Sequence, residues 1–169
     1  LVGSEMFIRD RPQPLVLDAD GINALAGHMD EWERRRGRVT VLTPHEGEFL
    51  RVGGNLSQGR TAAAEDFARR SEAVVVLKGP GTVVAGPDGR CRVNTTGNCG
   101  MAKGGSGDVL SGVVLALLGL GMDAFDACCC AVWLHGRAGD LAAQEKGQWG
   151  MTPTDLLERL PQALREVTE

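Results

Sequence analysis

The chain has 169 residues, of which 43% are apolar and 24% are charged, and its formal net charge at pH 7 is −4. This length predicts one domain or part of one, and the composition argues against a disordered chain. The mild acidity argues against a nucleic-acid-binding surface, the longest mainly apolar stretch (109–122) is too short to cross a bilayer, and the first residues lack the order of a secretory signal.

Short apolar runs bounded by polar or turn residues predict the strands of a sheet. Segments with helical patterns separate the first three runs, and such crossovers imply parallel strands with helices on both faces of the sheet. The turn signal at 87–89 joins the last two runs as a hairpin. The predicted strands are 15–17, 39–42, 73–77, 82–85 and 90–93.

The segments between and after these strands carry helical patterns and capping signals. Pro44 is placed to open the second helix. Thr152 is placed to cap the last helix, with Pro153 at its first position and Asp155 three residues after the cap. The predicted helices are 22–35 with Gly27 as a candidate break, 46–52, 61–70, 106–118, 123–144 and a last one that begins at residue 153.

The strongest functional signal is the glycine-rich loop 94–108, which runs directly into an apolar helix. Its glycines let the backbone approach an anion closely, and the helix N-terminus offers unpaired N–H groups at the positive end of the helix dipole. The loop therefore predicts a phosphate-binding cradle. Asp108 either caps the helix or, as we favour, acts as a general base that takes a proton from a substrate hydroxyl. Lys103 either adds positive charge to this anion site or is solvated.

Two further loops follow predicted strands. Lys78 stands among glycines at the end of the third predicted strand and suits a diphosphate, although a tight turn with a surface lysine would produce the same pattern. His45 follows the second predicted strand and is a candidate either to bind a substrate or to serve a structural role. Glu46 or Glu48 is placed to bind Mg²⁺ through water.

Asp18 and Asp20 follow the first predicted strand, and each of them can either face the site or cap the next helix. Four loops thus follow strands, and ligands of open α/β sheets bind beyond the carboxyl ends of the strands. One shared site for a nucleotide and a substrate is the economical interpretation of this pattern.

The five cysteines, three of them consecutive at 128–130, do not have the spacing of a disulfide framework. We interpret them as small buried side chains in a reduced, cytoplasmic protein, with Cys99 in the glycine-rich loop as the exception. Their spacing does not suggest a zinc site either.

Five segments of the chain carry motifs of a known family: DADGINAL, LTPHEGEF, VLKGPGTVV, NTTGNCGMAKGGSGDVLSG and GMTPTDLLERLP. Together they resemble the ADP-dependent NAD(P)H-hydrate dehydratase family of the ribokinase-like superfamily. The most specific are the TPHEGEF and TGNCGMAKGGSGD segments. The resemblance implies an α/β fold, a three-layer α/β/α domain with a mostly parallel central sheet that is incomplete at its N-terminus.

The resemblance implies a lyase that returns hydrated NADH or NADPH to NAD(P)H. The nucleotide, ADP or ATP with Mg²⁺, phosphorylates the hydroxyl of the hydrated ring, and phosphate is then eliminated. Asp108 matches the presumed base, which also contacts the substrate. The other matched positions are Lys78, Gly79, Pro80, Gly81, Thr82 and Gly107 for the nucleotide, and His45, Asn98, Gly104 and Gly105 for the substrate.

The chain departs from the family in its loop and in its length. Cys99 stands where the family commonly has proline, and Lys103 and Ser106 stand where it commonly has threonine. Family domains are longer, so a sheet edge that the complete domain would pair is expected to be open here, which favours association. We interpret residues 1–12 as a non-native or disordered start and 13–169 as the C-terminal portion of one ribokinase-like domain.

The resemblance also implies a homo-oligomer and allows an epimerase domain upstream, with neither a nucleic-acid nor a membrane partner. Two alternatives to the dehydratase remain. A ribokinase-like kinase of a vitamin-type alcohol would use the same base, Asp108, and a nucleotide-binding fragment would keep the cradle without turnover. The TPHEGEF loop favours the dehydratase.

Overall fold

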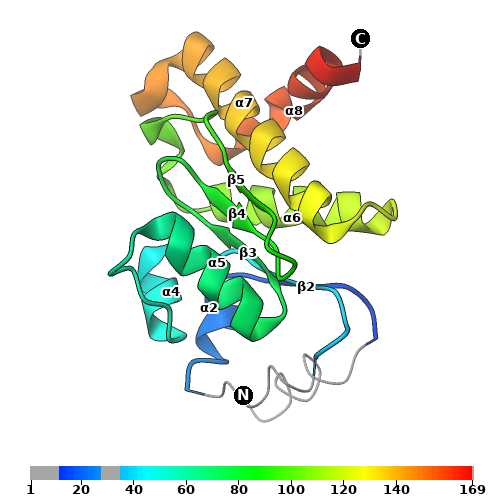
Figure 1. Ribbon diagram of the computed structural model, residues 1–169. Helices are drawn as coiled ribbons and strands as arrows, with labels where there is room; N and C mark the ends of the chain where they lie inside the picture. The colour runs from blue at the N-terminus through cyan, green and yellow to red at the C-terminus, as the bar shows by residue number, and fades with distance from the viewer. Residues whose placement is uncertain (1–11, 28–34, 169) are drawn as a thin grey trace.

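The computed structural model describes residues 12–27 and 35–168. Its sheet consists of β1 (Leu15–Leu17), β2 (Thr40–Leu42), β3 (Val74–Leu77), β4 (Val83–Ala85) and β5 (Cys91–Val93), adjacent in that order (Figure 1). β1, β2 and β3 are parallel, whereas β4 is antiparallel to both β3 and β5. β5 therefore runs in the same direction as β3.

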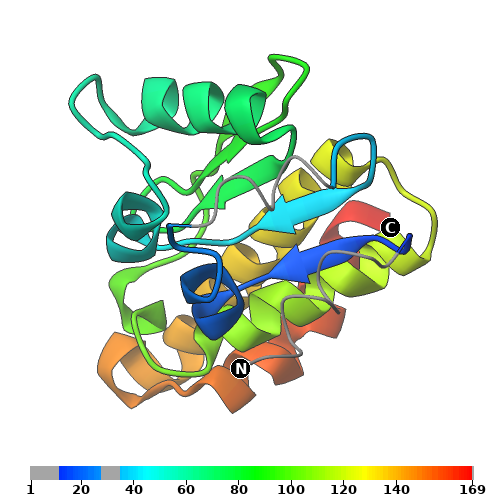
Figure 2. The ribbon, with the colours of Figure 1, turned by 90° about the horizontal axis from the view of Figure 1, so that it is seen from below.

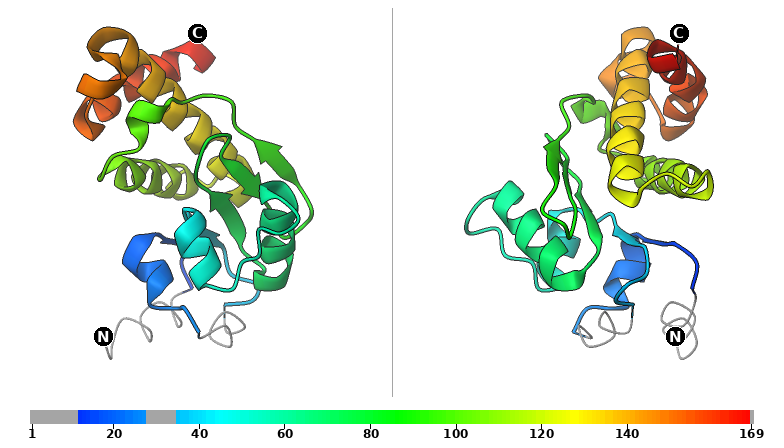
Figure 3. Two further views of the ribbon diagram at one scale, coloured as in Figure 1. Left: turned by 90° about the vertical axis from the view of Figure 1, so that its left-hand side faces the viewer. Right: turned by 45° about the vertical axis from the view of Figure 1, so that its right-hand side comes forward.

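Helices cover both faces of this sheet (Figures 2 and 3). One face carries α2 (Ala19–Asn23), α4 (Glu46–Arg51) and α5 (Arg60–Ser71). The other face carries α6 (Ser106–Gly119) and α7 (Ala124–Gly150), and α8 (Pro153–Thr168) packs outside against α7. The three-layer α/β/α architecture with a mostly parallel sheet is the one that the resemblance implied.

The sheet separates two apolar cores because successive strand residues point to opposite faces. In β3, Val75 and Leu77 pack toward α4 and α5, and Val74 and Val76 pack toward α6 and α7. All four residues are buried, as expected for a strand with helices on both sides. A third cluster, around Leu156, joins α7 to α8.

The predicted strands are confirmed to within a residue at each end, and the hairpin of β4 and β5 is confirmed as well. The helix predicted over 22–35 is wrong in its described part, although the break predicted at Gly27 is confirmed. α2 begins at Ala19 and ends at Asn23, and residues 24–27 form turns that close at Gly27, where φ is 83°. A positive φ favours glycine and ends a helix. Residues 28–34 lie outside the described residues.

Two helix boundaries differ from the prediction and one is confirmed. Pro44 does not open α4, because His45 is the N-cap residue and Pro44 precedes it. α7 continues past residue 144 to Gly150, interrupted at Gly147 with φ of 71°. The predicted cap of α8 is present: the N–H of Thr152 donates to Asp155 at 2.8 Å, and the N–H of Asp155 donates to the Thr152 hydroxyl at 3.3 Å.

Both outer strands have one unpaired edge within the described residues, since β1 pairs only with β2 and β5 only with β4. No helix among residues 12–27 and 35–168 has the length and apolar content to span a membrane. Of the predicted non-native start, residues 1–11 lie outside the described part of the chain.

Candidate active site

Loops that follow four strands meet at one edge of the sheet. β1, β2, β3 and β5 run in the same direction, so their carboxyl ends share that edge. Asp18, Thr43, Lys78 and Asn94 are the first residues after these ends. The predicted convergence of the loops is therefore confirmed.

Lys78 follows β3, the central strand, and its side chain is only 22% exposed. Its Nζ lies 2.6 Å from Oδ1 of Asp18 and 3.9 Å from Oε2 of Glu48. Its backbone N–H donates to the carbonyl of Pro44 at 2.8 Å, and a parallel bridge pairs it with His45. The alternative of a surface lysine in a simple turn is therefore wrong, because the ammonium group lies between two carboxylates.

Asp18 is half-buried, and side chains from two other segments donate hydrogen bonds to its carboxylate. Oδ1 accepts from Lys78, and Oδ2 accepts from the hydroxyl of Ser111 at 3.1 Å. Burial alone would raise the pKa of Asp18. The hydrogen bond and charge of Lys78, together with the hydroxyls of Thr43 and Ser111, outweigh burial and hold this pKa below its ordinary value. The carboxylate is therefore ionised at neutral pH.

His45 is fixed by a capping box at the start of α4. The ring atom Nδ1 of His45 accepts from the backbone N–H of Glu48 at 3.2 Å, and the backbone N–H of His45 donates to Oε2 of Glu48 at 2.8 Å. The side chain is still 53% exposed, so it is both structural and accessible to a ligand. Glu48 is buried in these contacts, and Glu46 pairs with Arg60 at 3.1 Å.

α6 begins where the glycine-rich loop ends. Gly105 is the N-cap residue, with φ of 95°, so Asp108, the third residue of the helix, is not its cap. Asp108 is exposed, and its carboxylate has no hydrogen-bond or ion-pair partner within the described ranges. A Cβ built on Gly107 would lie 3.2 Å from Oδ2 of Asp18 and 3.4 Å from Nζ of Lys78. The backbone at Gly107 is therefore directly beside the pair formed by Asp18 and Lys78.

The first turn of α6 is also supported from α7. Nε2 of His135 donates to the carbonyl of Ser106 at 2.8 Å, since a carbonyl can only accept. Burial lowers the pKa of His135, against the opposing effect of this hydrogen bond, so the ring is neutral at pH 7. The start of α6 is thus held by a partly buried, uncharged donor.

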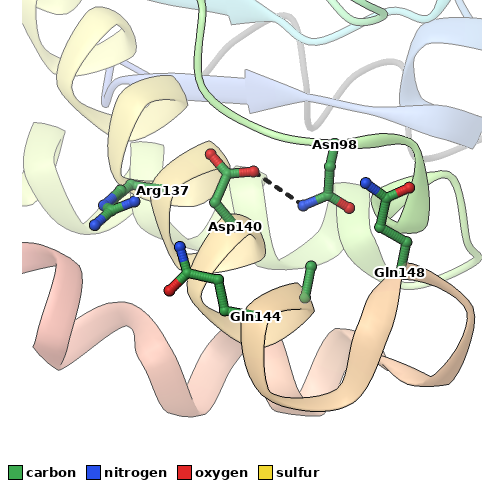
Figure 4. A pocket seen from close by; sticks show the side chains of 6 residues that line it. Asn98, Arg137, Asp140, Gln144 and Gln148 are labelled. Carbon is green, nitrogen blue, oxygen red and sulfur yellow. Dashed lines mark hydrogen bonds between the residues drawn. The ribbon is translucent and has the colours of Figure 1, made fainter.

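The glycine-rich loop is attached to α7 through Asp140. Its carboxylate accepts from the N–H of Gly97 at 2.9 Å and from Nδ2 of Asn98 at 3.0 Å (Figure 4). Asn98 also caps the short η1 helix (Cys99–Met101) by accepting from the N–H of Gly100. The Asn98 side chain thus points to α7 and not to Lys78. It lines an open hollow with Arg137, Asp140, Ala143, Gln144 and Gln148.

Two glycines of α7 let the loop approach closely. A Cβ on Gly136 would lie 2.2 Å from Oγ1 of Thr96, and one on Gly139 would lie 2.3 Å from Sδ of Met101. Separations below 3.0 Å are not tolerated without a shift of one partner. At Gly136 the backbone of Thr96 would also lie within 2.8 Å of a Cβ, so only glycine fits there, whereas at Gly139 the side chain of Met101 would have to move.

Lys103 has neither of the roles that the sequence left open. Its Nζ donates to the carbonyls of Gln148 at 3.3 Å and Trp149 at 2.9 Å, and also to that of Met151. These carbonyls belong to the C-terminal end of α7, which carries the negative end of its dipole. Lys103 therefore attaches the C-terminal part of the glycine-rich loop to α7.

The cysteines are free thiols, as predicted, but only Cys128 is buried, and Cys91, Cys129 and Cys130 are partly exposed, so the prediction of buried side chains is wrong for these three. Burial raises the pKa of the Cys128 thiol, and it raises that of Cys91 to about 11. Both are therefore protonated at neutral pH. Cys99 is exposed, and its Sγ contacts Oε1 of Gln148 at 2.8 Å, which joins the loop to the end of α7 once more.

The Lys78–Thr82 loop is shaped by a residue that the sequence did not single out. Arg60 donates from the start of α5 to the carbonyls of Leu77 at 3.0 Å and Gly81 at 3.1 Å, and also to that of Pro80. Gly79 has φ of 150°, and a Cβ there would lie 2.6 Å from the guanidinium group. Arg60 therefore clamps this loop from the face opposite α6.

Three contributing residues were absent from the predicted site: Arg60, Ser111 and Asp140. Helix periodicity could have identified Ser111, because it lies one turn after Gly107 on the same face of α6. No local pattern marks Arg60 or Asp140, because each acts on a loop that is distant in the chain. Among the residues that the structure describes, no group of three or more His, Cys, Asp or Glu side chains could hold a metal ion.

Comparisons with known proteins point to one family. The family described as NAD(P)H-hydrate dehydratase matches residues 5–162. A bifunctional NAD(P)H-hydrate repair enzyme of Thermofilum pendens is 46% identical over 165 residues, which cover 95% of this chain and 31% of that protein. An ADP-dependent (S)-NAD(P)H-hydrate dehydratase of Bacillus subtilis is 40% identical over 152 residues, which cover 88% of this chain and 53% of that protein.

Solved structures agree with the sequence comparison. The crystal structure of an ADP/ATP-dependent NAD(P)H-hydrate dehydratase from Bacillus subtilis, co-crystallised with ATP and Mg²⁺, superposes with a TM-score of 0.83 at 36% identity. The match covers 94% of this chain and 57% of that one. A ribokinase-like superfamily protein from Enterococcus faecalis gives a TM-score of 0.82 at 26% identity. The chain thus spans between 31% and 57% of the length of these relatives.

Proposed function

We propose, because the chain belongs to the NAD(P)H-hydrate dehydratase family, that it contributes the nucleotide site and the base for dehydrating hydrated NADH or NADPH. The reaction is that of a lyase that restores NAD(P)H at the expense of ADP or ATP. One observation carries the proposal: the start of α6, Lys78 and His45 adjoin one another at a single edge of the sheet. Nucleotide and substrate can then meet across that edge.

The nucleotide-binding role rests on the two loops that flank this edge. Lys78 supplies an ammonium group, and Gly79 to Thr82 supply a backbone loop that Arg60 holds in place. Gly107 lies in the first turn of α6, where the backbone N–H groups lack intrahelical partners. Gly104 and Gly105 precede it, and a Cβ at Gly104 would meet open space. The cradle that the sequence predicted thus suits a diphosphate group.

Asp108 is our candidate for the base. Its carboxylate is exposed at the first turn of α6 and unpaired within the described ranges, so it is free to accept a proton from the substrate hydroxyl. His45 is held rigidly by its capping box and is accessible, which suits a contact with the hydrated ring. Asn98 contributes indirectly, since its side chain anchors the glycine-rich loop to Asp140.

The nucleotide, when bound, would supply the phosphoryl group that turns the hydroxyl of the hydrated ring into a leaving group. Mg²⁺ is commonly held by phosphate oxygens, water and only one or two carboxylates. Glu46 fits that mode, because its carboxylate is half-exposed at the start of α4, the helix that follows β2 at the same edge of the sheet. The protein's own part is to hold the phosphates, orient the ring and remove the proton.

An absorbance assay tests the proposal. The purified chain is mixed with hydrated NADH, Mg²⁺ and either ADP or ATP, and recovery of reduced-nicotinamide absorbance and release of orthophosphate are followed. We expect both signals to depend on the nucleotide. A kinase that keeps its product would consume ATP on a vitamin-type alcohol and release no orthophosphate, and a binding module would give neither signal.

The Asp108→Asn variant tests the base itself. We expect it to lower the turnover rate by about 10²–10⁴-fold, the range that general-base catalysis supplies, while nucleotide affinity changes little. The variant removes a charge from an exposed side chain, so we expect its melting temperature to match that of the unchanged chain. An unchanged rate would show that another group removes the proton.

We also propose the context in which the chain works. A cytoplasmic location suits its free thiols, and the longer relatives that are named bifunctional repair enzymes suggest an epimerase domain upstream. We propose a homo-oligomer in view of the open edge of β1 in the described sheet. Sedimentation of the purified chain at several concentrations tests the last point.

A further inference from the structure

Three side chains from three separate segments form one hydrogen-bonded chain beside the predicted phosphate site. The hydroxyl of Ser111 in α6 donates to Oδ2 of Asp18 at 3.1 Å, and Nζ of Lys78 donates to Oδ1 of Asp18 at 2.6 Å. The carboxylate thus connects α6 to the Lys78 loop, although the two segments are far apart in the sequence.

The hydrogen bond with Asp18 fixes the position of the Lys78 ammonium group. A lysine has a flexible four-carbon stem, so its position depends on what its end group contacts. Asp18 is at hydrogen-bond distance, whereas Glu48 at 3.9 Å is beyond it. The ammonium group is drawn toward Gly107 at the start of α6, and at least one of its protons is left for a phosphate oxygen.

The backbone shows that Asp18 is used for this contact and not for its helix. Asp18 occupies the N-cap position of α2, yet its side chain makes no capping hydrogen bond. The next residue, Ala19, has φ of 44°, which is unfavourable for a residue other than glycine. Strain of this kind tends to gather at functional sites, where other interactions maintain it.

We propose that Asp18 is a positioning residue for the nucleotide: it holds the Lys78 ammonium group against the start of α6, and Ser111 in turn orients Asp18. The inference rests on the nucleotide-binding part of the proposed function and adds a residue to it. It does not make Asp18 a contact of the nucleotide, since its effect passes through Lys78.

Calorimetric titration of the full chain with ATP and Mg²⁺ tests the inference in a double-mutant cycle of Asp18→Asn, Lys78→Met and both together. We expect Asp18→Asn to weaken nucleotide affinity by roughly tenfold, the equivalent of one charge-assisted hydrogen bond. The double variant should bind no more weakly than Lys78→Met alone, because Asp18 has no lysine left to position. Asp20→Asn is the matched control, since Asp20 is exposed and lies two residues away. It should leave affinity unchanged.

Ser111→Ala provides a second test that changes no charge. It should weaken affinity less than Asp18→Asn, and this loss should vanish in the Lys78→Met background. The inference would be overturned if the losses of nucleotide affinity in Asp18→Asn and Lys78→Met multiplied in the double variant. It would also be overturned if Asp18→Asn bound the nucleotide as tightly as the unchanged chain or more tightly, or if the chain bound no nucleotide. If the chain binds nucleotide with the expected cycle but does not restore hydrated NADH, only the proposed dehydratase activity is wrong.

Discussion

At the scale of single residues, Gly107 leaves little room for a side chain beside Asp18 and Lys78. We expect Gly107→Ala to weaken nucleotide affinity severalfold, because the added methyl group would lie 3.2 Å from Asp18 and 3.4 Å from Lys78. Those side chains must move by a few tenths of an ångström, and the backbone loses its close approach to phosphate. The variant should still fold, since alanine suits a helix better than glycine. Titration with ATP and Mg²⁺ measures the affinity.

Gly112→Ala is the control on the same helix. A Cβ at Gly112 meets open space, so we expect a gain in the free energy of unfolding of about 0.5–1 kcal/mol and no change in affinity. Equal affinities of the two variants would show that Gly107 does not adjoin the nucleotide.

Residue roles could be predicted where local sequence defines them. The spacing of Thr152 and Asp155 predicted a cap, and a cap is present. Asp18 and Lys103 could not be resolved from sequence, because their partners lie far away in the chain: Lys78 for the first, and the end of α7 for the second. Each had plausible local alternatives, and distant contacts decided between them.

At the scale of single elements, the stability of the start of α8 depends on pH. Hydrogen bonds from Lys146 and from the hydroxyl and N–H of Thr152 lower the pKa of Asp155 to about 2. The pKa of an unfolded aspartate is about 3.9, so the stability that Asp155 contributes is fully present above about pH 4 and is lost as the pH falls toward 2. We expect the melting temperature to decrease across that window.

The Asp155→Asn variant isolates this contribution. It should melt below the unchanged chain near neutral pH, and the two melting temperatures should converge as the pH approaches 2. A constant difference over the whole range would mean that ionisation of Asp155 does not stabilise the cap. Circular dichroism at a series of pH values gives both melting curves.

Elements could be predicted where their apolar pattern is continuous. The valine run of β3 and the apolar stretch of α6 appear close to the predicted positions. α2 differs because Gly27, at φ of 83°, closes the turns that follow Asn23, although the residues before it would suit a longer helix. The extension of α7 past residue 144 depends on contacts with Lys103 and Cys99, which the helix sequence does not reveal.

At the scale of the whole molecule, nucleotide binding should stabilise the fold. A ligand that binds only the folded state at 100 times its dissociation constant adds about 2.7 kcal/mol to the free energy of unfolding. For a chain of this length that corresponds to roughly 5–10 °C in melting temperature. We expect this shift with ATP and Mg²⁺ and a much smaller one in Lys78→Met. Differential scanning fluorimetry measures it, and equal shifts would show that the nucleotide binds elsewhere.

The arrangement of the layers could be predicted from the order of strands and helices along the sequence. Strands that alternate with helices gave a parallel sheet, and the carboxyl ends of β1, β2 and β3 met at one edge as expected. The attachment of the glycine-rich loop to α7 was not predictable, because it depends on how closely two surfaces approach at Gly136 and Gly139. Packing distances of this kind are properties of the assembled fold.

That close packing has a consequence for how such sequences can diverge. Thr96 and Met101 fit against α7 only while residues 136 and 139 have no side chain. A smaller side chain in the loop could make room at 139, where only the side chain of Met101 is close, but not at 136, where the backbone carbonyl of Thr96 would lie 2.8 Å from a Cβ. We expect paired substitutions at 101 and 139, and glycine at 136 throughout, wherever this region varies among descendants of a common ancestor.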